Sequence, residues 1–371
     1  MADTQSRKIP VTVLTGYLGA GKTTLLNRIL SQNHGKKFAV IVNEFGEIGI
    51  DNDLVVGADE EVFEMNNGCV CCTVRGDLIR IIDGLLRRKN DFDGIIVETT
   101  GLADPAPVAQ TFFVDEDVQT KTKLDAVVTV ADAKWLSDRL KDAPEAKNQV
   151  AFADVILLNK TDLVTPEELE EVEARIRGIN PYARLHRTQR SEIDISKVLN
   201  QGAFDLDRIL KLEPAFMEVD EHDHEHHHHD HDHGHAHDHH EHGPDCGCGH
   251  DHGHDHKHDH GHDHHHGLKA VHDNEMQSFS FSTEKSLSPD KFFPWVQNLV
   301  ATEGQNILRS KGILSFKDDP ERFVFQGVHM ILDGDHQRAW KDDEARLSRI
   351  VFIGRHLNQK SLEEGFLSCV A

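Results

Sequence analysis

A glycine-rich segment near the start of the chain has the residue types and the spacing of a phosphate-binding loop, or P-loop. Residues 16–23 match the pattern G-x-x-x-x-G-K-[ST] and lie between an apolar run and a helical stretch. In such a loop, backbone N–H groups surround the β-phosphate, the lysine contacts the β- and γ-phosphate oxygens, and the hydroxyl binds Mg²⁺. Lys22 and Thr23 are therefore expected to be catalytic, with Thr23 also a metal ligand. The residues expected to bind the phosphates are Gly16, Tyr17, Leu18, Gly19, Ala20, Gly21, Lys22, Thr23 and Thr24.

A second motif, Asn159-Lys160-Thr161-Asp162, indicates which base the nucleotide carries, and it directly follows the apolar run 155–158. A carboxylate at Asp162 can accept hydrogen bonds from both N1–H and the exocyclic amine of guanine. Adenine offers no such pair and would leave the carboxylate unpaired. The stem of Lys160 is expected to pack along the base, and Asn159 to tie this segment to the P-loop. The nucleotide is therefore expected to be GTP.

An acidic residue and a glycine lie between these two motifs, at the end of another apolar run. Glu98 stands where many GTPases have the aspartate of a D-x-x-G element, and Gly101 follows three residues later. Glu98 is expected to hold Mg²⁺ through water as a catalytic residue, and the N–H of Gly101 to contact the γ-phosphate. Leu102 occupies the position at which fast GTPases have a water-orienting glutamine. The expected activity is therefore slow hydrolysis of GTP to GDP and phosphate, below about one turnover per second.

Three cysteines, Cys69, Cys71 and Cys72, lie between the P-loop and this acidic residue. Three thiols within four residues suit a soft or borderline cation such as Zn²⁺, Co²⁺ or Cu⁺. They leave a fourth position open for water, for a ligand of an acceptor protein or for a carboxylate, and Glu44 and Glu47 are candidates. The alternatives are a redox pair or buried cysteines that bind nothing. The pattern favours a metal site.

Histidine is concentrated in one internal stretch. Residues 218–266 contain 23 of the 29 histidines, 14 Asp or Glu residues and a single lysine. The stretch cannot form a core, so residues 218–268 are expected to be a disordered linker that collects metal ions weakly. Cys246 and Cys248 would add one tighter point. The alternative is a solvated linker without a function, although a linker needs no histidine.

The fold that must position these residues is predicted from continuous apolar runs, which are typical of parallel strands covered on both faces. The predicted strands are 9–15, 38–42, 94–97, 124–130 and 155–158, and the predicted helices are 23–30, 78–88 and 166–177. Strands that alternate with helices indicate a doubly wound parallel α/β sheet, the architecture of P-loop NTPases, over residues 8–215.

Residues 269–371 are expected to form a small α+β domain. Its predicted strands are 276–281, 313–316, 322–328 and 350–352, and its predicted helices are 288–301 and 362–367. The aromatic residues expected in its core are Phe292, Phe293, Trp295 and Trp340. His329 is expected to be a packed histidine rather than a metal ligand, and His336, His356 and Cys369 are weaker candidates still.

Composition excludes several classes of protein. The net charge of −24, without a basic stripe, argues against nucleic-acid binding, because phosphate contacts need clustered Lys and Arg. No apolar run approaches the roughly 18–20 residues of a membrane span, and the first eight residues lack a secretory apolar region. Six cysteines in this spacing do not form a secreted disulfide framework. A cytoplasmic location is expected.

Taken together, these motifs resemble the CobW-type GTPases, P-loop metallochaperones related to the nickel-insertion GTPases of hydrogenase and urease maturation. The segments that carry the resemblance are 16–24, 43–46, 68–72, 98–101 and 159–162, with 309–312, 325–329 and 352–355 in the second domain. The resemblance implies that Cys69, Cys71 and Cys72 bind the metal, and that residues 16–23 with Asn159, Lys160 and Asp162 bind GTP.

The implied function is that of a GTP-hydrolysing metallochaperone of the zinc-regulated GTPase metalloprotein activator type. Its cofactors would be GTP, Mg²⁺ and Zn²⁺, with Co²⁺ or another divalent metal as an alternative. Its partner would be a client metalloprotein, whose identity stays open, as does the oligomeric state. A second hypothesis is a metal store in which the His-rich linker dominates and the GTPase domain is regulatory. A third, a small-molecule kinase, is disfavoured by the guanine motif at 159–162.

Overall fold

The computed structural model describes residues 8–32, 35–43, 61–65, 73–87, 92–202, 275–341 and 344–371. Two sheets organise these residues, one of seven strands and one of five. Both sheets belong to one compact unit of the chain. The predicted linker, residues 218–268, lies outside the described residues.

All neighbouring strands of the seven-stranded sheet are parallel, and their order is β3-β2-β4-β1-β5-β6-β7. The strands are β1 (Ile9–Thr15), β2 (Phe38–Asn43), β3 (Glu61–Met65), β4 (Gly94–Glu98), β5 (Thr122–Asp132), β6 (Val155–Asn159) and β7 (Arg184–Arg187). The register pairs Leu14 with Glu98, and Asp132 with Asn159. The carboxyl ends of the central strands therefore meet at one edge, where ligands bind in open α/β sheets.

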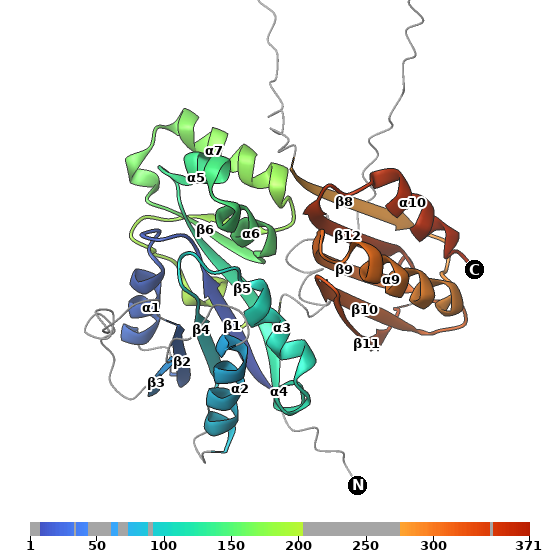
Figure 1. Ribbon diagram of the computed structural model, residues 1–371, viewed down its shortest axis with the longest axis horizontal. Helices are drawn as coiled ribbons and strands as arrows, with labels where there is room; N and C mark the ends of the chain where they lie inside the picture. Colours follow the sequence, from blue (N-terminus) through green and yellow to red (C-terminus); the bar gives the residue numbers. More distant parts are fainter. Residues whose placement is uncertain are drawn as a thin grey trace, which may run out of the picture. The chain divides into compact units, whose positions relative to one another are not determined.

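Helices cover both faces of this sheet (Figure 1). The helices are α1 (Lys22–Ser31), α2 (Thr73–Leu86), α3 (Ala106–Val114), α4 (Glu116–Lys121), α5 (Leu136–Asp142), α6 (Pro144–Phe152) and α7 (Pro166–Ile179), with 3₁₀ turns at Thr161–Leu163 and Ile195–Lys197. On one face, Leu25 and Ile29 of α1 pack against strand residues such as Val128. On the other face, Leu78 and Ile82 of α2 pack in a larger core. The start of α7 is a capping box, in which Thr165 and Glu168 each bond the other's backbone N–H.

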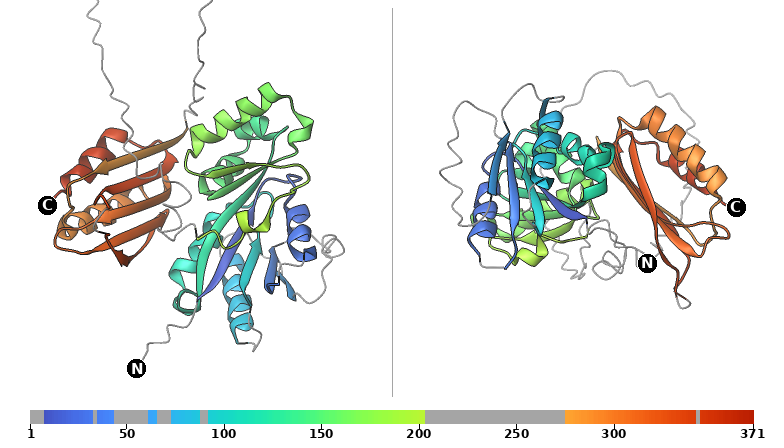
Figure 2. Two further views of the ribbon diagram at one scale, coloured as in Figure 1. Left: turned by 180° about the vertical axis from the view of Figure 1, so that it is seen from behind. Right: turned by 90° about the horizontal axis from the view of Figure 1, so that it is seen from below.

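The five-stranded sheet is antiparallel, with the order β11-β10-β9-β12-β8. Its strands are β8 (Met276–Thr283), β9 (Ile307–Ser315), β10 (Glu321–Val328), β11 (Ile331–Ala339) and β12 (Ser348–Arg355). Helices α9 (Pro289–Glu303) and α10 (Gln359–Ser368) pack on one face, as Figure 2 shows. Their core there is aromatic, with Phe292, Phe352 and Phe366 fully buried. This arrangement confirms the predicted α+β character of the second domain.

The opposite face of this sheet joins the core of the parallel sheet, and an ion cluster is buried in the contact. Asp154, immediately before β6, accepts a hydrogen bond from Arg309 at 2.7 Å and another from Lys311. Arg309 also donates to the carbonyl oxygen of Phe152. Burial alone would raise the pKa of Asp154, but the neighbouring charges of Arg309 and Lys311 outweigh it and hold that pKa below its usual value. Asp154 is therefore a buried carboxylate stabilised by two cations.

The doubly wound parallel α/β fold predicted from the apolar runs is confirmed. Three strands, β3, β7 and β11, were not predicted. The strand β11 was not predicted because most of its side chains are exposed and polar. The strand β7 (Arg-Leu-His-Arg) carries no apolar run either. Phe293 departs from the predicted core, since its side chain is 37% exposed. Its ring lies at the rim, where it packs against Phe316 and Phe323.

Within the described part of the chain, no helix has both the length and the apolar character that crossing a membrane requires.

Candidate nucleotide-binding site

The P-loop connects the end of β1 to the start of α1 at the carboxyl edge of the parallel sheet. Gly16 and Gly21 have φ angles of 140° and 115°, which favour glycine. A Cβ atom at Gly16 would lie 2.1 Å from the carbonyl oxygen of Val130, and one at Gly21 would lie 2.5 Å from Nδ2 of Asn159. The close packing of neighbouring segments therefore requires glycine at both positions.

Lys22 closes the P-loop from inside. Its side chain is buried, and Nζ donates a hydrogen bond to the carbonyl oxygen of Gly16 at 2.7 Å. The ammonium group therefore lies against the backbone that would surround a phosphate group. This is the placement that the sequence predicts for a lysine that neutralises β- and γ-phosphate charge.

Thr23 and Glu98 come together because β1 and β4 are adjacent in the sheet. The hydroxyl Oγ1 of Thr23 donates to Oε1 of Glu98 across 3.5 Å, and the Glu98 side chain is only 6% exposed. A hydroxyl and a carboxylate are oxygen ligands of the kind that Mg²⁺ prefers, directly or through water. These two residues fit a magnesium ion at the phosphate end of the site.

The loop after β4 packs directly against the P-loop. A Cβ atom at Gly101 would lie 2.6 Å from the backbone nitrogen of Leu18, so no larger residue fits this approach. Gln149 of α6 donates hydrogen bonds to the carbonyl oxygens of Gly101 at 3.0 Å and of Ala103 at 3.2 Å. Leu102 points to solvent with 54% of its surface exposed, and its apolar side chain cannot orient a water molecule.

The base-reading segment is fixed to the P-loop by Asn159, as the sequence predicts. Its Nδ2 donates to the carbonyl oxygen of Ala20 at 2.9 Å, and its Oδ1 accepts from the N–H of Ser191 at 2.8 Å. Lys160 has a left-handed backbone with φ of 61°, and its Nζ lies 2.7 Å from Oδ2 of Asp132. The carboxylate of the next acidic residue, Asp162, is exposed at this edge. The described geometry thus places the phosphate-binding and base-reading motifs side by side.

Four residues of this arrangement were missed from the sequence. They are Asp104, Asp132, Gln149 and Ser191. Ser191 donates through its hydroxyl to the carbonyl oxygen of Gly21 at 3.0 Å, although it follows the P-loop by 170 residues. No short motif marks any of the four, because only the fold brings them to the loops that they support.

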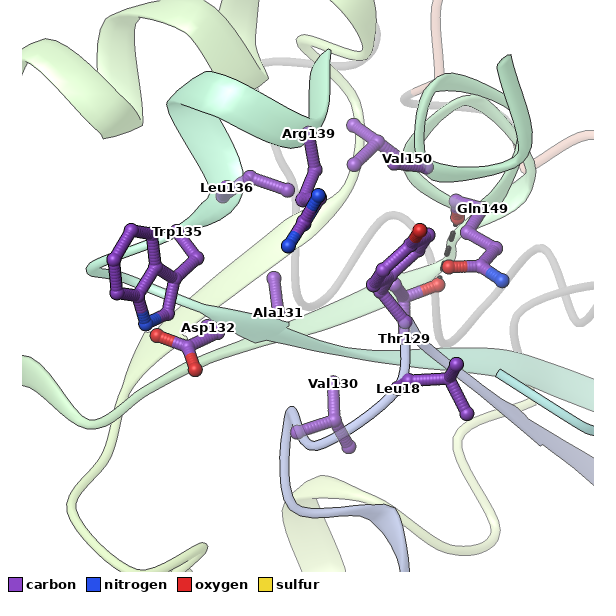
Figure 3. A pocket seen from close by; sticks show the side chains of 12 residues that line it. Leu18, Thr129, Val130, Ala131, Asp132, Trp135, Leu136, Arg139, Gln149 and Val150 are labelled. Carbon is purple, nitrogen blue, oxygen red and sulfur yellow. Dashed lines mark hydrogen bonds between the residues drawn. The ribbon is translucent and has the colours of Figure 1, made fainter. Parts of the chain in front are cut away.

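A pocket lies beside the P-loop, between β5 and the helices α5 and α6 (Figure 3). The guanidinium of Arg139 lies 5.2 Å from the centre of the Tyr17 ring, and Trp135 at the rim is 51% exposed. The P-loop residues Tyr17 and Leu18 form one wall of this pocket, and Asp132, the partner of Lys160, lies in its lining.

The candidate metal ligands Cys69, Cys71, Cys72, Glu44 and Glu47 lie outside the described residues. The same holds for Cys246, Cys248 and the His-rich linker. Among the residues that the structure describes, no group of three or more His, Cys, Asp or Glu side chains is arranged to hold a metal ion.

Two histidines and one cysteine of the second domain, His329, His336 and Cys369, contact other residues of the fold. His329 forms a left-handed turn after β10, and its ring packs 5.8 Å from that of Phe152, so it is a packed histidine. His336 is paired with Asp319 at 2.8 Å. Cys369 is buried, and burial raises the pKa of its thiol, which makes it a poor metal ligand.

The fold and the site define a P-loop nucleotide-binding protein. Residues 10–187 match the nucleotide-binding domain of the CobW/HypB/UreG family, and residues 276–370 match the cobalamin synthesis protein cobW C-terminal domain. The chain belongs to the CobW family of GTPases.

Full-length relatives share both domains. The chain is 30% identical to "Zinc chaperone YjiA" of Escherichia coli, over 96% of this chain and 98% of the relative. It is 32% identical to "Zinc-regulated GTPase metalloprotein activator 1" of Schizosaccharomyces pombe, over 95% and 84%. It is also 32% identical to "Zinc chaperone CobW" of Pseudomonas aeruginosa, over 98% and 92%. The crystal structure of Zn(II)-bound YjiA GTPase from E. coli superposes with a TM-score of 0.68 at 26% identity and covers 98% of this chain and all of that one.

Proposed function

We propose that this protein is a GTP-hydrolysing metallochaperone that binds Zn²⁺ at Cys69, Cys71 and Cys72 and transfers it to a client metalloprotein. The observation that carries the GTPase part is the hydrogen bond between Asn159 and Ala20, which joins the base-reading segment to the P-loop. The metal part is supported by the sequence position of the three cysteines, between the P-loop and Glu98, and by relatives named as zinc chaperones.

The nucleotide is held at both ends in this proposal. Residues 16–24 bind its phosphates, with Lys22 against the β- and γ-phosphate oxygens, and Asp162 accepts hydrogen bonds from guanine. Thr23 binds Mg²⁺ through its hydroxyl, and Glu98 does so through water. The N–H of Gly101 contacts the γ-phosphate. Hydrolysis is slow, because Leu102 supplies no polar group to orient the attacking water.

The metal cargo is bound by three thiolates, and its fourth position is left for Glu47, for water or for a ligand of the client. A site with three protein ligands leaves one coordination position open, and such a site can release its metal. Metal binding at the three cysteines would be coupled to GTP hydrolysis, because in sequence they lie between the P-loop and Glu98. By linkage, this coupling requires different metal affinities with GTP and with GDP.

The chain would divide its work among three parts. Residues 8–215 form the GTPase domain, residues 218–268 collect metal ions, and residues 269–371 form the C-terminal domain. The client is a metalloprotein that lacks its metal, and neither nucleic acid nor membrane is needed as a partner.

The test is a Co²⁺ and Zn²⁺ titration of the full chain carrying Cys246→Ser and Cys248→Ser, with GTP, with GDP and without nucleotide. Co²⁺–thiolate absorption reports cysteine ligation even when the histidines also bind metal. The expected result is one tight site whose affinity differs between GTP and GDP, and which is lost in Cys69→Ser/Cys71→Ser/Cys72→Ser. Equal affinities with both nucleotides would contradict the coupling, and unchanged absorption in the triple variant would contradict the site.

The high histidine content favours a second candidate function, metal storage. Residues 218–266 hold 23 of the 29 histidines and could dominate metal binding. Deleting residues 222–266 separates the two functions. A store loses its metal-dependent function on this deletion, whereas a chaperone keeps one tight site and its transfer activity. A release of phosphate and GDP alone, with no phosphorylated acceptor, excludes a small-molecule kinase.

A further inference from the structure

Helix α6 supports the loop after β4 through Gln149. This loop, residues 99–105, carries Gly101 and is called the nucleotide-sensing loop below. The Gln149 side chain is 1% exposed and donates to the carbonyl oxygens of Gly101 and Ala103. The backbone carbonyl oxygen of Gln149 accepts a hydrogen bond from the Thr129 hydroxyl at 2.8 Å, drawn as a dashed line in Figure 3. Gln149 therefore connects the loop that carries Gly101 to α6 and, through its backbone, to β5.

The preceding residue, Asn148, makes two different connections with its amide group. Nδ2 donates to Oδ2 of Asp104 at 2.9 Å, and Oδ1 accepts from Nη2 of Arg355 at 2.6 Å. The other carboxylate oxygen of Asp104 accepts from the N–H of Ala106 at 2.9 Å, at the start of α3. Asn148 thus joins the end of the Gly101 loop to an arginine of the five-stranded sheet.

Arg355 is itself held firmly at the end of β12. Its backbone N–H donates to the carbonyl oxygen of Asn306 at 2.8 Å, and a Cβ atom at the neighbouring Gly354 would lie 2.1 Å from the same oxygen. A second link runs beside it, because Nζ of Lys147 lies 2.6 Å from Oε2 of Glu275, just before β8. Of three consecutive residues of α6, Lys147 therefore contacts the C-terminal domain, Gln149 contacts the loop, and Asn148 contacts both.

We propose that Arg355 is a positioning residue for the GTPase site: through Asn148 and Asp104 it sets the position of the loop that carries Gly101. This inference rests on the proposed function, in which that loop contacts the γ-phosphate of GTP. A loop that must adapt to the γ-phosphate moves against Asp104, and the chain of hydrogen bonds carries this movement to Arg355. By reciprocity, a client that displaces Arg355 changes the preference of the site for GTP over GDP.

The test exchanges donor and acceptor along this chain in the full-length protein. Asn148→Asp places a carboxylate opposite Asp104 and removes the donor, while Asp104→Asn places one amide opposite another. The double variant Asn148→Asp/Asp104→Asn restores a hydrogen bond of reversed direction and keeps an acceptor for Arg355. Arg355→Met removes the donor of the C-terminal domain. Arg346→Met is the matched control, because this exposed arginine donates within its own domain, to the carbonyl oxygen of Asp319.

The measurements are kcat and KM for GTP, the ratio of GTP to GDP affinity and the melting temperature without nucleotide. Arg355→Met and Asn148→Asp are expected to change the affinity ratio about three- to tenfold and to lower kcat, and the double variant to recover both. Arg346→Met is expected to match the wild type. If the wild type neither binds nor hydrolyses GTP, the proposed function itself fails. If the wild type hydrolyses GTP and Arg355→Met changes only the melting temperature, or if the double variant recovers nothing, the positioning role is wrong.

Discussion

The side-chain amide of Asn159 donates a hydrogen bond to the carbonyl oxygen of Ala20 at 2.9 Å, so the end of β6 is joined directly to the P-loop. The opposite atom of the same amide accepts from the N–H of Ser191 and from the hydroxyl of Thr188. One buried side chain therefore holds three segments that are distant in sequence. Asn159 thus connects the P-loop, the end of β6 and the segment 188–191.

Asn159→Ala is expected to weaken GTP and GDP binding by similar factors, because the lost hydrogen bonds support the loop and do not touch the γ-phosphate. The free energy of unfolding should fall by about 2–3 kcal/mol, since Ala20, Thr188 and Ser191 lose buried partners. Titration with both nucleotides and urea unfolding check these outcomes. A loss confined to GTP would show that Asn159 acts on the γ-phosphate end instead.

Asp162→Asn should change which base is preferred. An amide keeps one acceptor but places a donor opposite the exocyclic amine of guanine, so GTP affinity should fall by about 10- to 100-fold. Xanthosine triphosphate has an oxygen in place of that amine, and the variant should bind it better than the wild type does. Competition between the two nucleotides measures the change. The exposed position of Asp162 predicts an unchanged melting temperature, and equal losses for both nucleotides would rule out base recognition.

Glu98→Gln tests the magnesium ligand. The buried carboxylate lies 3.5 Å from the Thr23 hydroxyl, and an amide lacks the charge that holds hydrated Mg²⁺. Mg²⁺ affinity and kcat are each expected to fall by about 10- to 100-fold. GTP binding without Mg²⁺ should persist, which fluorescence titration in chelator measures. The control is Glu116→Gln on the exposed start of α4, and an equal loss there would mean a general charge effect.

Asp154→Asn should destabilise the protein in a pH-dependent way. At pH 7 the variant leaves Arg309 and Lys311 facing an uncharged group, and the cost should be about 3 kcal/mol. The neighbouring cations hold the folded-state pKa of Asp154 below its ordinary value of about 3.9. The carboxylate therefore contributes fully above that value, and the contribution is lost as pH falls through the lower folded-state pKa.

The difference in unfolding free energy between wild type and Asp154→Asn should thus shrink only in strong acid. Denaturant unfolding between pH 7 and pH 3 follows it. Asp138→Asn is the control, because its exposed pair with Lys141 should contribute less than about 1 kcal/mol. The difference should stay constant above about pH 5 and begin to shrink as the pH approaches 3, because the unfolded wild type then binds a proton that folded Asp154 does not. A difference that has not shrunk by pH 3 while the protein remains folded would contradict the lowered pKa. A difference already lost at pH 6 would contradict the direction of the shift.

The sequence predicted those elements that a continuous apolar run marks. Most residues of the central strands β1 and β5 and all residues of β6 are buried, and each strand contains a continuous apolar run. The edge strand β11 is a counterexample, since much of it is exposed and polar and it joins the sheet by pairing with β10. Its position depends on backbone hydrogen bonds, which leave no mark in the order of side chains.

The residues of the site also divide into those that the sequence could predict and those that it could not. Contiguous motifs such as residues 16–23 and 159–162 could be predicted, because their chemistry needs neighbours in the chain. Gln149 and Asp104 could not be predicted, since the partners of their side chains in the site lie tens of residues away in the sequence. In the sequence, nothing distinguishes Gln149 from the other polar residues of α6. The missed residues position the predicted ones.

The strand β6 begins beside the carboxylate of Asp154 and ends at Asn159. Five extended residues span about 17 Å, and the strand is bonded to β5 on one side and β7 on the other. It therefore sets the distance between Asp154, which bonds Arg309 of the C-terminal domain, and Asn159, which bonds the P-loop. Gain or loss of a single residue here would put one end out of register and turn buried side chains to the wrong face. Among relatives, changes in chain length should consequently be absent from this strand.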